Sequence, residues 1–222
     1  MKTWARANKG FIMFLLLFGV IRTAVADWSP IPSASMRPTL LEGDVVFINR
    51  LAFNVKVPLT DVVLAHTGEP KRGEIVIFAS PQDGTRLIKR LMAVPGDVVE
   101  MRNERLIVNG QSATYAPAGT ATETVGPTPN VLASKYTETL DGHTHNIQIF
   151  PDRAFMRSFG PMTIPNGQYL MLGDSRDNSN DSRFIGLVPR KLLTGRAERV
   201  LVSADILGNW LPRSDRFAMK LQ

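Results

Sequence analysis

The sequence predicts a mainly β fold: an antiparallel β-sheet core with a smaller inserted lobe of β and irregular structure, behind one N-terminal transmembrane helix. Short runs rich in Val, Ile, Leu and Phe follow one another after residue 27, namely 44–53, 73–80, 86–94, 97–110 and 168–174. Turn signals bound these runs and no amphipathic helical pattern separates them, which favours antiparallel pairing. Only residues 188–201 suggest a helical turn.

The segment 113–146 differs from these runs. It is rich in Thr, Ala, Pro and Gly, which predicts irregular structure or a peripheral insertion. We therefore divide the chain into five segments. They are a cytoplasmic N-terminus (1–9), a transmembrane anchor (10–27), a first section of the core (28–101), an inserted lobe (102–165), and a second section of the core with a C-terminal tail (166–222).

Composition excludes several functions. The 222 residues contain no Cys, so disulfides and thiolate metal sites are ruled out. The net charge is +6, but residues 1–26 contain Lys2, Arg6, Lys9 and Arg22 and no acid, which leaves 26 − 4 = 22 basic against 20 acidic side chains elsewhere. This N-terminal excess fits anionic lipid better than nucleic acid, so we expect no nucleic-acid partner.

The N-terminal segment has two interpretations. Residues 11–21 are apolar apart from one glycine. A basic start, a short apolar stretch and the small residues 24–26 are typical of a secretory signal that is removed. Residues 10–26 also give roughly 25 Å of helix, enough for a short membrane span, and Trp4 and Trp28 stand at its ends. In both cases the basic residues precede the apolar run, which places the rest of the chain outside the cytoplasm.

Two serines are candidates for chemistry just after this segment. Ser33 and Ser35 stand between Pro32 and Pro38, which restrict the backbone on both sides. A serine nucleophile needs a base, for which histidine is the usual choice. The histidines are His66, His143 and His145; no acidic ligand at a convincing spacing accompanies them, so we expect the last two to form a solvent-exposed loop pair and no metal site.

Lys89 is the alternative base. The run 86–94 predicts a strand in which Lys89 shares a face with Leu87 and Leu91, while Arg90 shares the other with Ile88 and Met92. Burial would lower the pKa of a lysine and let the neutral amine accept a serine proton, which arginine cannot do. Because both faces are apolar, alternation does not decide which cation is buried.

A polar segment, 173–183, follows the apolar run 168–172. Its arginines, Arg176 and Arg183, could pair with Asp174, Asp177 or Asp181, and the fixed loop could then let one serine orient the lysine. A solvated loop is the plainer alternative.

Together these segments resemble one family, the type I signal peptidases. The stretch PSASMRPTL (32–40) is similar to its nucleophile motif, RGEIVIF with IKRLMAVPGD (72–78 and 88–97) to its lysine motif, and GDSRDNSNDSRFIGLVP (173–189) to its third motif. They occur in the family order, after an apolar segment. The resemblance covers roughly residues 10–100 and 165–200, and not the central insertion or the tail.

The resemblance implies a serine endopeptidase with a Ser-Lys dyad. Ser35 is then the nucleophile and Lys89 the general base. Ser33 provides an oxyanion hydroxyl together with the Ser35 N–H, and Ser179 hydrogen-bonds and orients the lysine amine.

Two further sets of residues follow from the resemblance. Asp181 and Arg183 become a supporting ion pair. Residues that flank the centre and could line shallow pockets for small side chains at positions −1 and −3 are Ile31, Met36, Leu40, Leu87 and Ile88. The departures, Ala34 and Ala93 for Gly and Ser175 for Asn, remove no chemical group that the reaction uses.

The same resemblance implies signal peptides of preproteins as substrates, no cofactor, a monomer, and a lipid bilayer as partner. The N-terminal segment becomes a retained single-pass anchor in the plasma (inner) membrane, with the catalytic domain on the periplasmic side. Self-cleavage after Ala26 remains a hypothesis.

Two alternative functions belong to other classes of protein. One is a secreted β-rich binding protein whose residues 1–26 are a removable signal. The other is a Ser-Lys self-cleaving regulator, but that class carries a DNA-binding head for which the chain offers no candidate segment.

Overall fold

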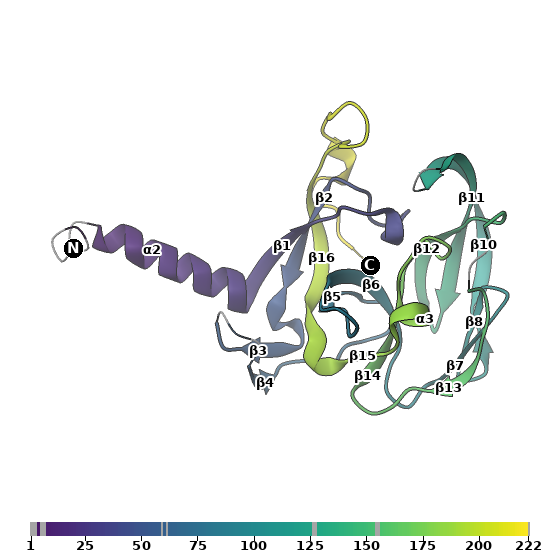
Figure 1. Ribbon diagram of the computed structural model, residues 1–222, viewed down its shortest axis with the longest axis horizontal. Coiled ribbons are helices and arrows are strands. Elements are labelled where there is room, and N and C mark those ends of the chain that lie inside the picture. The colour runs from purple at the N-terminus through teal and green to yellow at the C-terminus, as the bar shows by residue number, and fades with distance from the viewer. Residues whose placement is uncertain are drawn as a thin grey trace.

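The core is a seven-stranded sheet in the centre of the molecule, from which an N-terminal helix projects to one side and an inserted lobe to the other (Figure 1). The computed structural model describes residues 4, 8–58, 60, 62–125, 128–153 and 156–221. Most of the predicted cytoplasmic N-terminus, residues 1–9, therefore lies outside the described residues.

All pairs of neighbouring strands in the core sheet are antiparallel, which confirms the predicted fold class. In spatial order the strands are β1 (Ala26–Pro30), β2 (Asp44–Asn49), β16 (Leu193–Ser203), β5 (Ile75–Ala79), β6 (Arg86–Ala93), β14 (Gln168–Leu172) and β15 (Val188–Pro189). Because β16 lies between β2 and β5, segments from both ends of the chain form one sheet.

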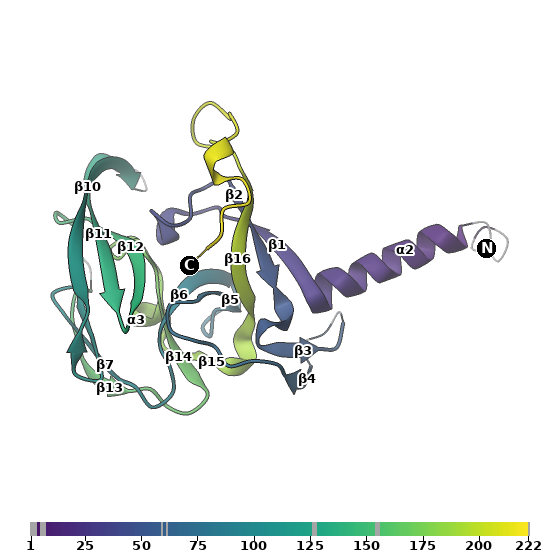
Figure 2. The same cartoon turned by 180° about the vertical axis from the view of Figure 1, so that it is seen from behind.

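The inserted lobe is more regular than its composition suggests. It holds a three-stranded sheet of β10 (Thr114–Val125), β11 (Thr128–Leu140) and β12 (His143–Ile149). Beside it lies a sheet of β13 (Phe159–Thr163), β7 (Val98–Arg102), β8 (Arg105–Val108) and β9 (Gln111–Ser112) (Figure 2). Irregular structure over 113–146 was therefore a wrong expectation. The many Thr side chains suit half-exposed strands, and a register shift between Pro117 and Thr120 accommodates the Pro and Gly.

The remaining elements are short. A small sheet pairs β3 (Asn54–Lys56) with β4 (Val63–His66), and α3 (Ser182–Ile185) is one helical turn. The 3₁₀ turns are η2 (Ala34–Met36), η3 (Arg50–Ala52), η4 (Arg190–Leu192) and η5 (Ser214–Arg216). The helical turn expected within 188–201 is limited to η4, because residues 193–203 alternate between buried and exposed positions as a strand does.

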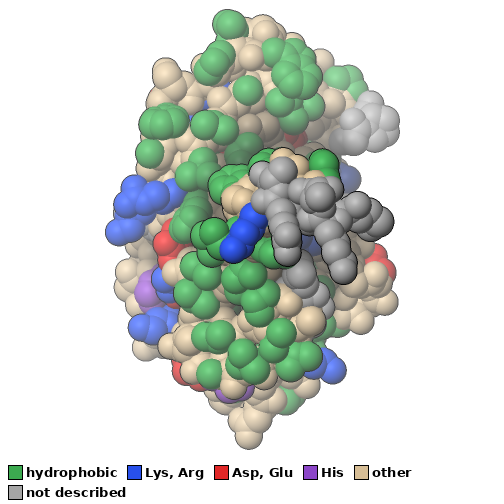
Figure 3. Space-filling view, turned by 90° about the vertical axis from the view of Figure 1, so that its left-hand side faces the viewer, with side chains coloured by type: hydrophobic (Ala, Val, Ile, Leu, Met, Phe, Trp, Pro, Cys, Tyr) green, Lys and Arg blue, Asp and Glu red, His purple; other side chains and the backbone are tan. Residues whose placement is uncertain are grey.

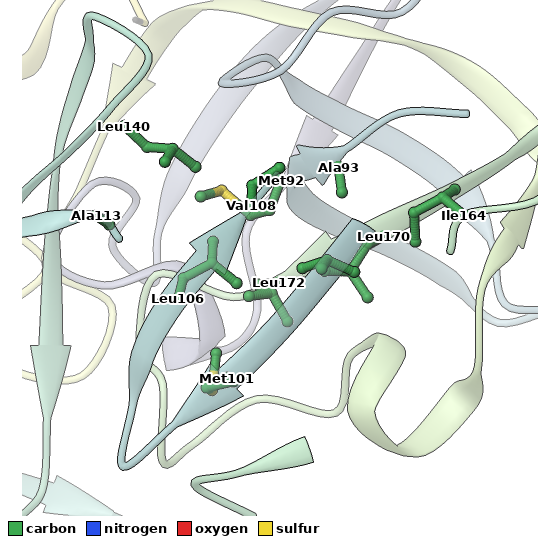
Figure 4. Close-up of a cluster of buried hydrophobic side chains, with 11 residues drawn as sticks. Met92, Ala93, Met101, Leu106, Val108, Ala113, Leu140, Ile164, Leu170 and Leu172 are labelled. Atoms are coloured by element: carbon green, nitrogen blue, oxygen red, sulfur yellow. The ribbon is translucent and has the colours of Figure 1, made fainter. Parts of the chain in front are cut away.

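Hydrophobic clusters fill both faces of the core sheet. Strand β5 contributes Val76 and Phe78 to one cluster, and Ile75 and Ile77 to another. A third cluster joins the core to the inserted lobe, where side chains from β6, β7, β8 and β14 meet (Figure 4). The strands beside the candidate serine and lysine are thus held from both sides.

The N-terminal helix is shorter than expected. Helix α2 covers Lys9–Val20, and none of its residues is buried; Figure 3, seen from the side of this helix, shows hydrophobic side chains spread around it. A π-helical turn, Ile21–Val25, follows, and Ala26 is already extended because it pairs with β2. Within the described part of the chain, no helix combines the length and hydropathy needed to cross a bilayer. The transmembrane helix expected over 10–27 is therefore not found: α2 ends at Val20, and residues 26 and 27 belong to β1.

Asp27 ties the end of this helical segment to the core. Its side chain is 5% exposed and accepts hydrogen bonds from three arginines, Arg22 (3.3 Å), Arg50 (3.5 Å) and Arg86 (2.9 Å). Because Arg86 begins β6, the segment is fixed to the strand that also holds Lys89. The Ala26–Asp27 bond itself lies in the β1–β2 ladder, so self-cleavage there requires β1 to leave β2 first.

Replacing Asp27 by Ala should lower the free energy of unfolding by about 2 kcal/mol, because the change removes a buried carboxylate that satisfies several charged donors. Urea unfolding of the full chain in neutral detergent measures this. The matched control is Asp152→Ala, which removes an exposed carboxylate. Equal effects of the two changes would contradict the role given to Asp27.

Candidate active site

Ser35 lies in the tight turn η2, where its position is fixed from two directions. The neighbouring Met36 is fully buried in the core cluster that contains Ile31 and Leu40. From the other side, the Ser175 N–H donates to the Ser35 carbonyl over 3.1 Å. The third motif therefore touches the backbone of the candidate nucleophile directly.

Lys89 reaches Ser35 from strand β6. Its Nζ lies 2.7 Å from the Ser35 Oγ and 2.9 Å from the Ile88 carbonyl oxygen, and the residue is 2% exposed. No ion pair within the described part of the chain involves Lys89. Burial lowers the pKa of Lys89 from 10.5 to about 8, although the more distant charges of Asp181 and Asp174 act in the opposite direction. A neutral amine is therefore accessible near neutral pH.

Arg90, the next residue, is buried as well but is fully paired. Its Nε and Nη2 donate to the two carboxylate oxygens of Asp174 over 2.9 and 2.8 Å, and its Nη1 donates to the Gly73 carbonyl over 2.7 Å. Strand alternation left open which of the two cations is buried. Both cations are buried in the structure. The Asp174 carboxylate pairs with Arg90, since a bidentate pair suits a guanidinium.

The two other candidate serines lie close to the pair. The Ser33 Oγ is 3.4 Å from the Ser35 Oγ, and Ser33 is exposed. Ser179 is buried, and within the described residues its Oγ has no hydrogen-bond partner. It packs against Gly173, where a Cβ would collide with both the Ser179 hydroxyl and the Ser35 carbonyl. The expected Ser179–Lys89 hydrogen bond is not formed, because Nζ points to Ser35 and Ile88 instead.

Asp181 and Arg183 form an ion pair, the pairing that the family resemblance implies. Both side chains are fully buried, with Arg183 Nε and Nη2 each 2.8 Å from an Asp181 oxygen. Asp181 also accepts the Gly173 N–H over 3.0 Å, and Arg183 donates to the Arg176 carbonyl over 2.6 Å. The ion pair thus fixes the loop that contains Ser179.

Arg176 has a partner that the sequence did not reveal. It makes a bidentate pair, at 3.0 and 2.5 Å, with Glu138 on β11 of the inserted lobe, rather than with an aspartate of its own motif. Tyr115 donates a further hydrogen bond to Glu138 over 2.6 Å. Burial opposes the charged form of Glu138, but Arg176 and His145 together outweigh it and hold the pKa of this carboxyl well below its usual range. No sequence signal marked this partner 38 residues away.

The histidines differ from expectation. His143 and His145 lie on β12 rather than in a loop, and His145 is buried with its Nε2 2.9 Å from Glu138. His66 contacts Asn54 over 2.7 Å. Among the residues that the structure describes, no group of three or more His, Cys, Asp or Glu side chains could hold a metal ion.

The chain is similar to known proteins of one family. The family profile described as "Signal peptidase, peptidase S26" matches residues 3–202. The chain belongs to this family. Signal peptidase I of Pseudomonas fluorescens is 34% identical over 88% of this chain and 72% of its own length, and that of Pseudomonas aeruginosa is 35% identical with the same coverage. A crystal structure of a signal peptidase I from Enterococcus faecalis is 28% identical over 58% of this chain and 96% of its own, with a TM-score of 0.34.

Family membership gives the class of enzyme. The chain is a serine endopeptidase, a hydrolase whose family removes signal peptides from preproteins. The alternative of a secreted β-rich binding protein is thereby set aside. The fold class assigned to the chain rests on the strand order described above and not on superposition with a solved relative.

The residues predicted to line the substrate pockets fall into two groups. Ile31, Met36 and Leu40 are at most 2% exposed and belong to the core. Leu87 and Ile88, on β6 just before Lys89, are partly exposed, and each packs on a different core cluster. In this conformation only Leu87 and Ile88 expose part of their side chains, so only these two could contact a substrate.

Replacing Lys89 by Met should stabilise the fold at pH 7 by up to about 3 kcal/mol, since the drop in pKa from 10.5 to about 8 measures the cost of burying the charge. Between pH 8 and 10.5 the unfolded wild type binds more protons than the folded one, so its stability rises with pH. The advantage of the variant should therefore shrink over this window in urea unfolding. Lys135→Met, at a half-exposed position, is the control; a pH-independent advantage of Lys89→Met would contradict the buried charge.

Proposed function

We propose that the chain removes N-terminal signal peptides from exported preproteins by means of a Ser35–Lys89 dyad, cutting after small residues at positions −1 and −3. One observation supports this above all: a buried amine, with no carboxylate partner among the described residues, lies 2.7 Å from a serine hydroxyl. A nucleophile and a base within hydrogen-bond reach are the requirement for acyl transfer.

The first step transfers a proton and forms a bond. Neutral Lys89 accepts the proton of the Ser35 hydroxyl as the Ser35 Oγ attacks the scissile carbonyl carbon. The carbonyl π electrons move to oxygen, and the resulting oxyanion is stabilised by the Ser33 hydroxyl and the Ser35 N–H, each worth about 3 kcal/mol in comparable sites. The position of Ser33 beside Ser35 supports this role.

The next two steps release the two products, first the amine of the mature protein and then the signal peptide. Protonated Lys89 donates its proton to the leaving amine as the C–N bond breaks, which leaves an ester on Ser35. Neutral Lys89 then takes a proton from water, the hydroxide attacks the ester, and the lysine returns a proton to the Ser35 Oγ. The signal peptide leaves as a carboxylic acid.

Ser179, Asp181 and Arg183 are positioning residues in this scheme. The buried ion pair holds the loop that carries Ser179 against Gly173. We propose that the Ser179 hydroxyl, which has no hydrogen-bond partner within the described residues, orients the amine once Lys89 turns from Ser35 to the leaving group. Its burial and its packing beside Ser35 support this assignment.

For substrate binding we propose the partly exposed Leu87 and Ile88 as contacts, with Ile31, Met36 and Leu40 supporting the site from the core. Apolar groups beside the dyad would favour small side chains at positions −1 and −3. The enzyme is proposed to act as a monomer without a cofactor.

We propose that residues 10–27 anchor the enzyme in the plasma (inner) membrane, with the N-terminus cytoplasmic and the catalytic domain periplasmic. The apolar helix α2, none of whose residues is buried, and the acid-free N-terminal segment support a lipid contact. The catalytic domain is proposed to comprise 28–101 and 166–222, which share one sheet, with 102–165 as an inserted lobe.

Ser35→Ala and Lys89→Met should each abolish cleavage of a preprotein, because each removes one reacting group while leaving a well-packed side chain. Cleavage by the full chain in detergent is followed on gels, with circular dichroism to check the fold. In the wild type, kcat/KM should rise with pH through about 8, the pKa of Lys89. Residual turnover by Lys89→Met at the wild-type rate would rule out the dyad.

Ser33→Ala should lower kcat about 100-fold with little change in KM, since an oxyanion donor acts mainly in the transition state. Ser29→Ala, on β1 outside the site, should leave both constants unchanged. An increase in KM alone would reassign Ser33 to substrate binding.

A further inference from the structure

A large cavity lies away from the dyad. It is found where the core sheet meets the inserted lobe and the C-terminal segment, which the three motifs do not cover. Its volume is about 660 Å³, and neither Ser35 nor Lys89 lines it. It is formed by the loop before β5, by β6 and β16, by the turn into β12, and by the C-terminal segment. Figure 1 shows the C-terminus between β16 and β12. An adjoining cavity of about 410 Å³ shares several lining residues with it, Arg90 and His145 among them.

The charged lining of the larger cavity is predominantly basic. Six Lys or Arg side chains and two carboxylates, Glu74 and Glu198, contribute to it. Both carboxylates pair with a single residue, Arg196, over 2.7 and 2.9 Å. Two other arginines are held by aspartates that do not line the cavity: Arg90 by Asp174, and Arg72 by Asp97 and Asp141. These guanidinium groups are therefore fixed in place by partners outside the cavity.

Three cations of the lining form no ion pair within the described part of the chain: Lys71, Arg199 and Lys220. Arg199 and Lys220 also stand directly opposite each other in an antiparallel bridge between β16 and the C-terminal segment. Like charges at such positions repel and destabilise the pairing. The fold thus holds two positive charges side by side that form no ion pair within the described chain, and the nearby carboxylate of Glu198 is paired with Arg196.

A buried polar atom of the same cavity is also unsatisfied. The His145 side chain is 5% exposed and lines both cavities, and its Nδ1 has no hydrogen-bond partner within the described residues. Its Nε2 is oriented towards Glu138. A buried ring nitrogen without a partner is rare in folded proteins and points to a ligand or water at this position.

We infer that this cavity binds a phosphate-bearing ligand. A phosphate carries more than one negative charge and several acceptor oxygens, which suits fixed guanidinium groups and unpaired cations together. The volume lies within the range of small-ligand sites. Free oligophosphates and phosphomonoester lipid headgroups share this chemistry, so the experiment includes both. The site would also explain why the C-terminal segment and the turn into β12 meet here.

Isothermal titration of the full chain in neutral detergent at low salt tests this, with inorganic tripolyphosphate as the soluble probe. Saturable binding with one site per chain is expected. Arg199→Gln/Lys220→Gln should weaken it at least tenfold, because the double change removes the two opposed charges. Lys71→Gln, in an exposed loop, should weaken it severalfold and cannot disturb the sheet. Unfolding midpoints of all variants establish that they are folded.

The matched control is Lys135→Gln/Lys191→Gln, which removes two charges away from both cavities and should change the affinity less than twofold. A second titration uses dihexanoyl phosphatidic acid below its micellar concentration, with dihexanoyl phosphatidylcholine as the zwitterionic comparison. Tighter binding of tripolyphosphate assigns a free phosphate ligand, and tighter binding of the phosphatidic acid assigns a headgroup. Absence of saturable binding by either probe, or equal losses in the two double variants, would overturn the inference.

Discussion

Two adjacent cations are buried on strand β6, and one carboxylate is placed to neutralise only one of them. The Asp174 carboxylate accepts two hydrogen bonds from Arg90 and a third from the Thr39 hydroxyl, over 2.5 Å. Lys89 is left with a hydroxyl and a carbonyl as neighbours, so burial can lower its pKa. If Asp174 turned to Lys89, the amine would be held in its charged form and could not act as a base. The proposed chemistry therefore depends on where this one carboxylate points.

The loop 173–183 holds the Asp174 carboxylate against Arg90, and the same loop contacts Ser35 and the inserted lobe. Its residue Asp174 fixes Arg90, its Ser175 N–H holds the Ser35 carbonyl, and its Arg176 reaches Glu138 in the inserted lobe. The lobe is thus not peripheral in an energetic sense. Breaking a buried pair such as Arg176–Glu138 would leave an unpaired charge next to the loop that contacts the backbone of Ser35.

Sequence patterns predicted most of the core but less of the lobe. Runs of apolar residues mark β2, β5, β6 and β14 because these strands are largely buried: Val, Ile and Phe in β2 and β5, and mainly Leu and Met in β6 and β14. The strands β10 and β11 lack such runs, since most residues of β10 are exposed and most residues of β11 are exposed or only half-buried. The motifs located Ser35 and Lys89 in the chain. Which cation stays unpaired, and which glutamate meets Arg176, depend on contacts between distant segments that no local pattern records.

In the proposed Ser35–Lys89 dyad the base owes its lowered pKa to burial, and burial of an unpaired amine opposes folding. The surrounding ion pairs Arg90–Asp174, Arg176–Glu138 and Arg183–Asp181 are themselves desolvated, so they add little net stability. What they supply is geometry: each arginine takes one carboxylate with two bonds, and none of these three carboxylates is left to approach Lys89. Hydrophobic packing on both faces of β5 and across the junction with the lobe then has to provide the net stability. Stability and reactivity in this fold therefore come from different residues, and a change that improves packing need not disturb the pKa of Lys89.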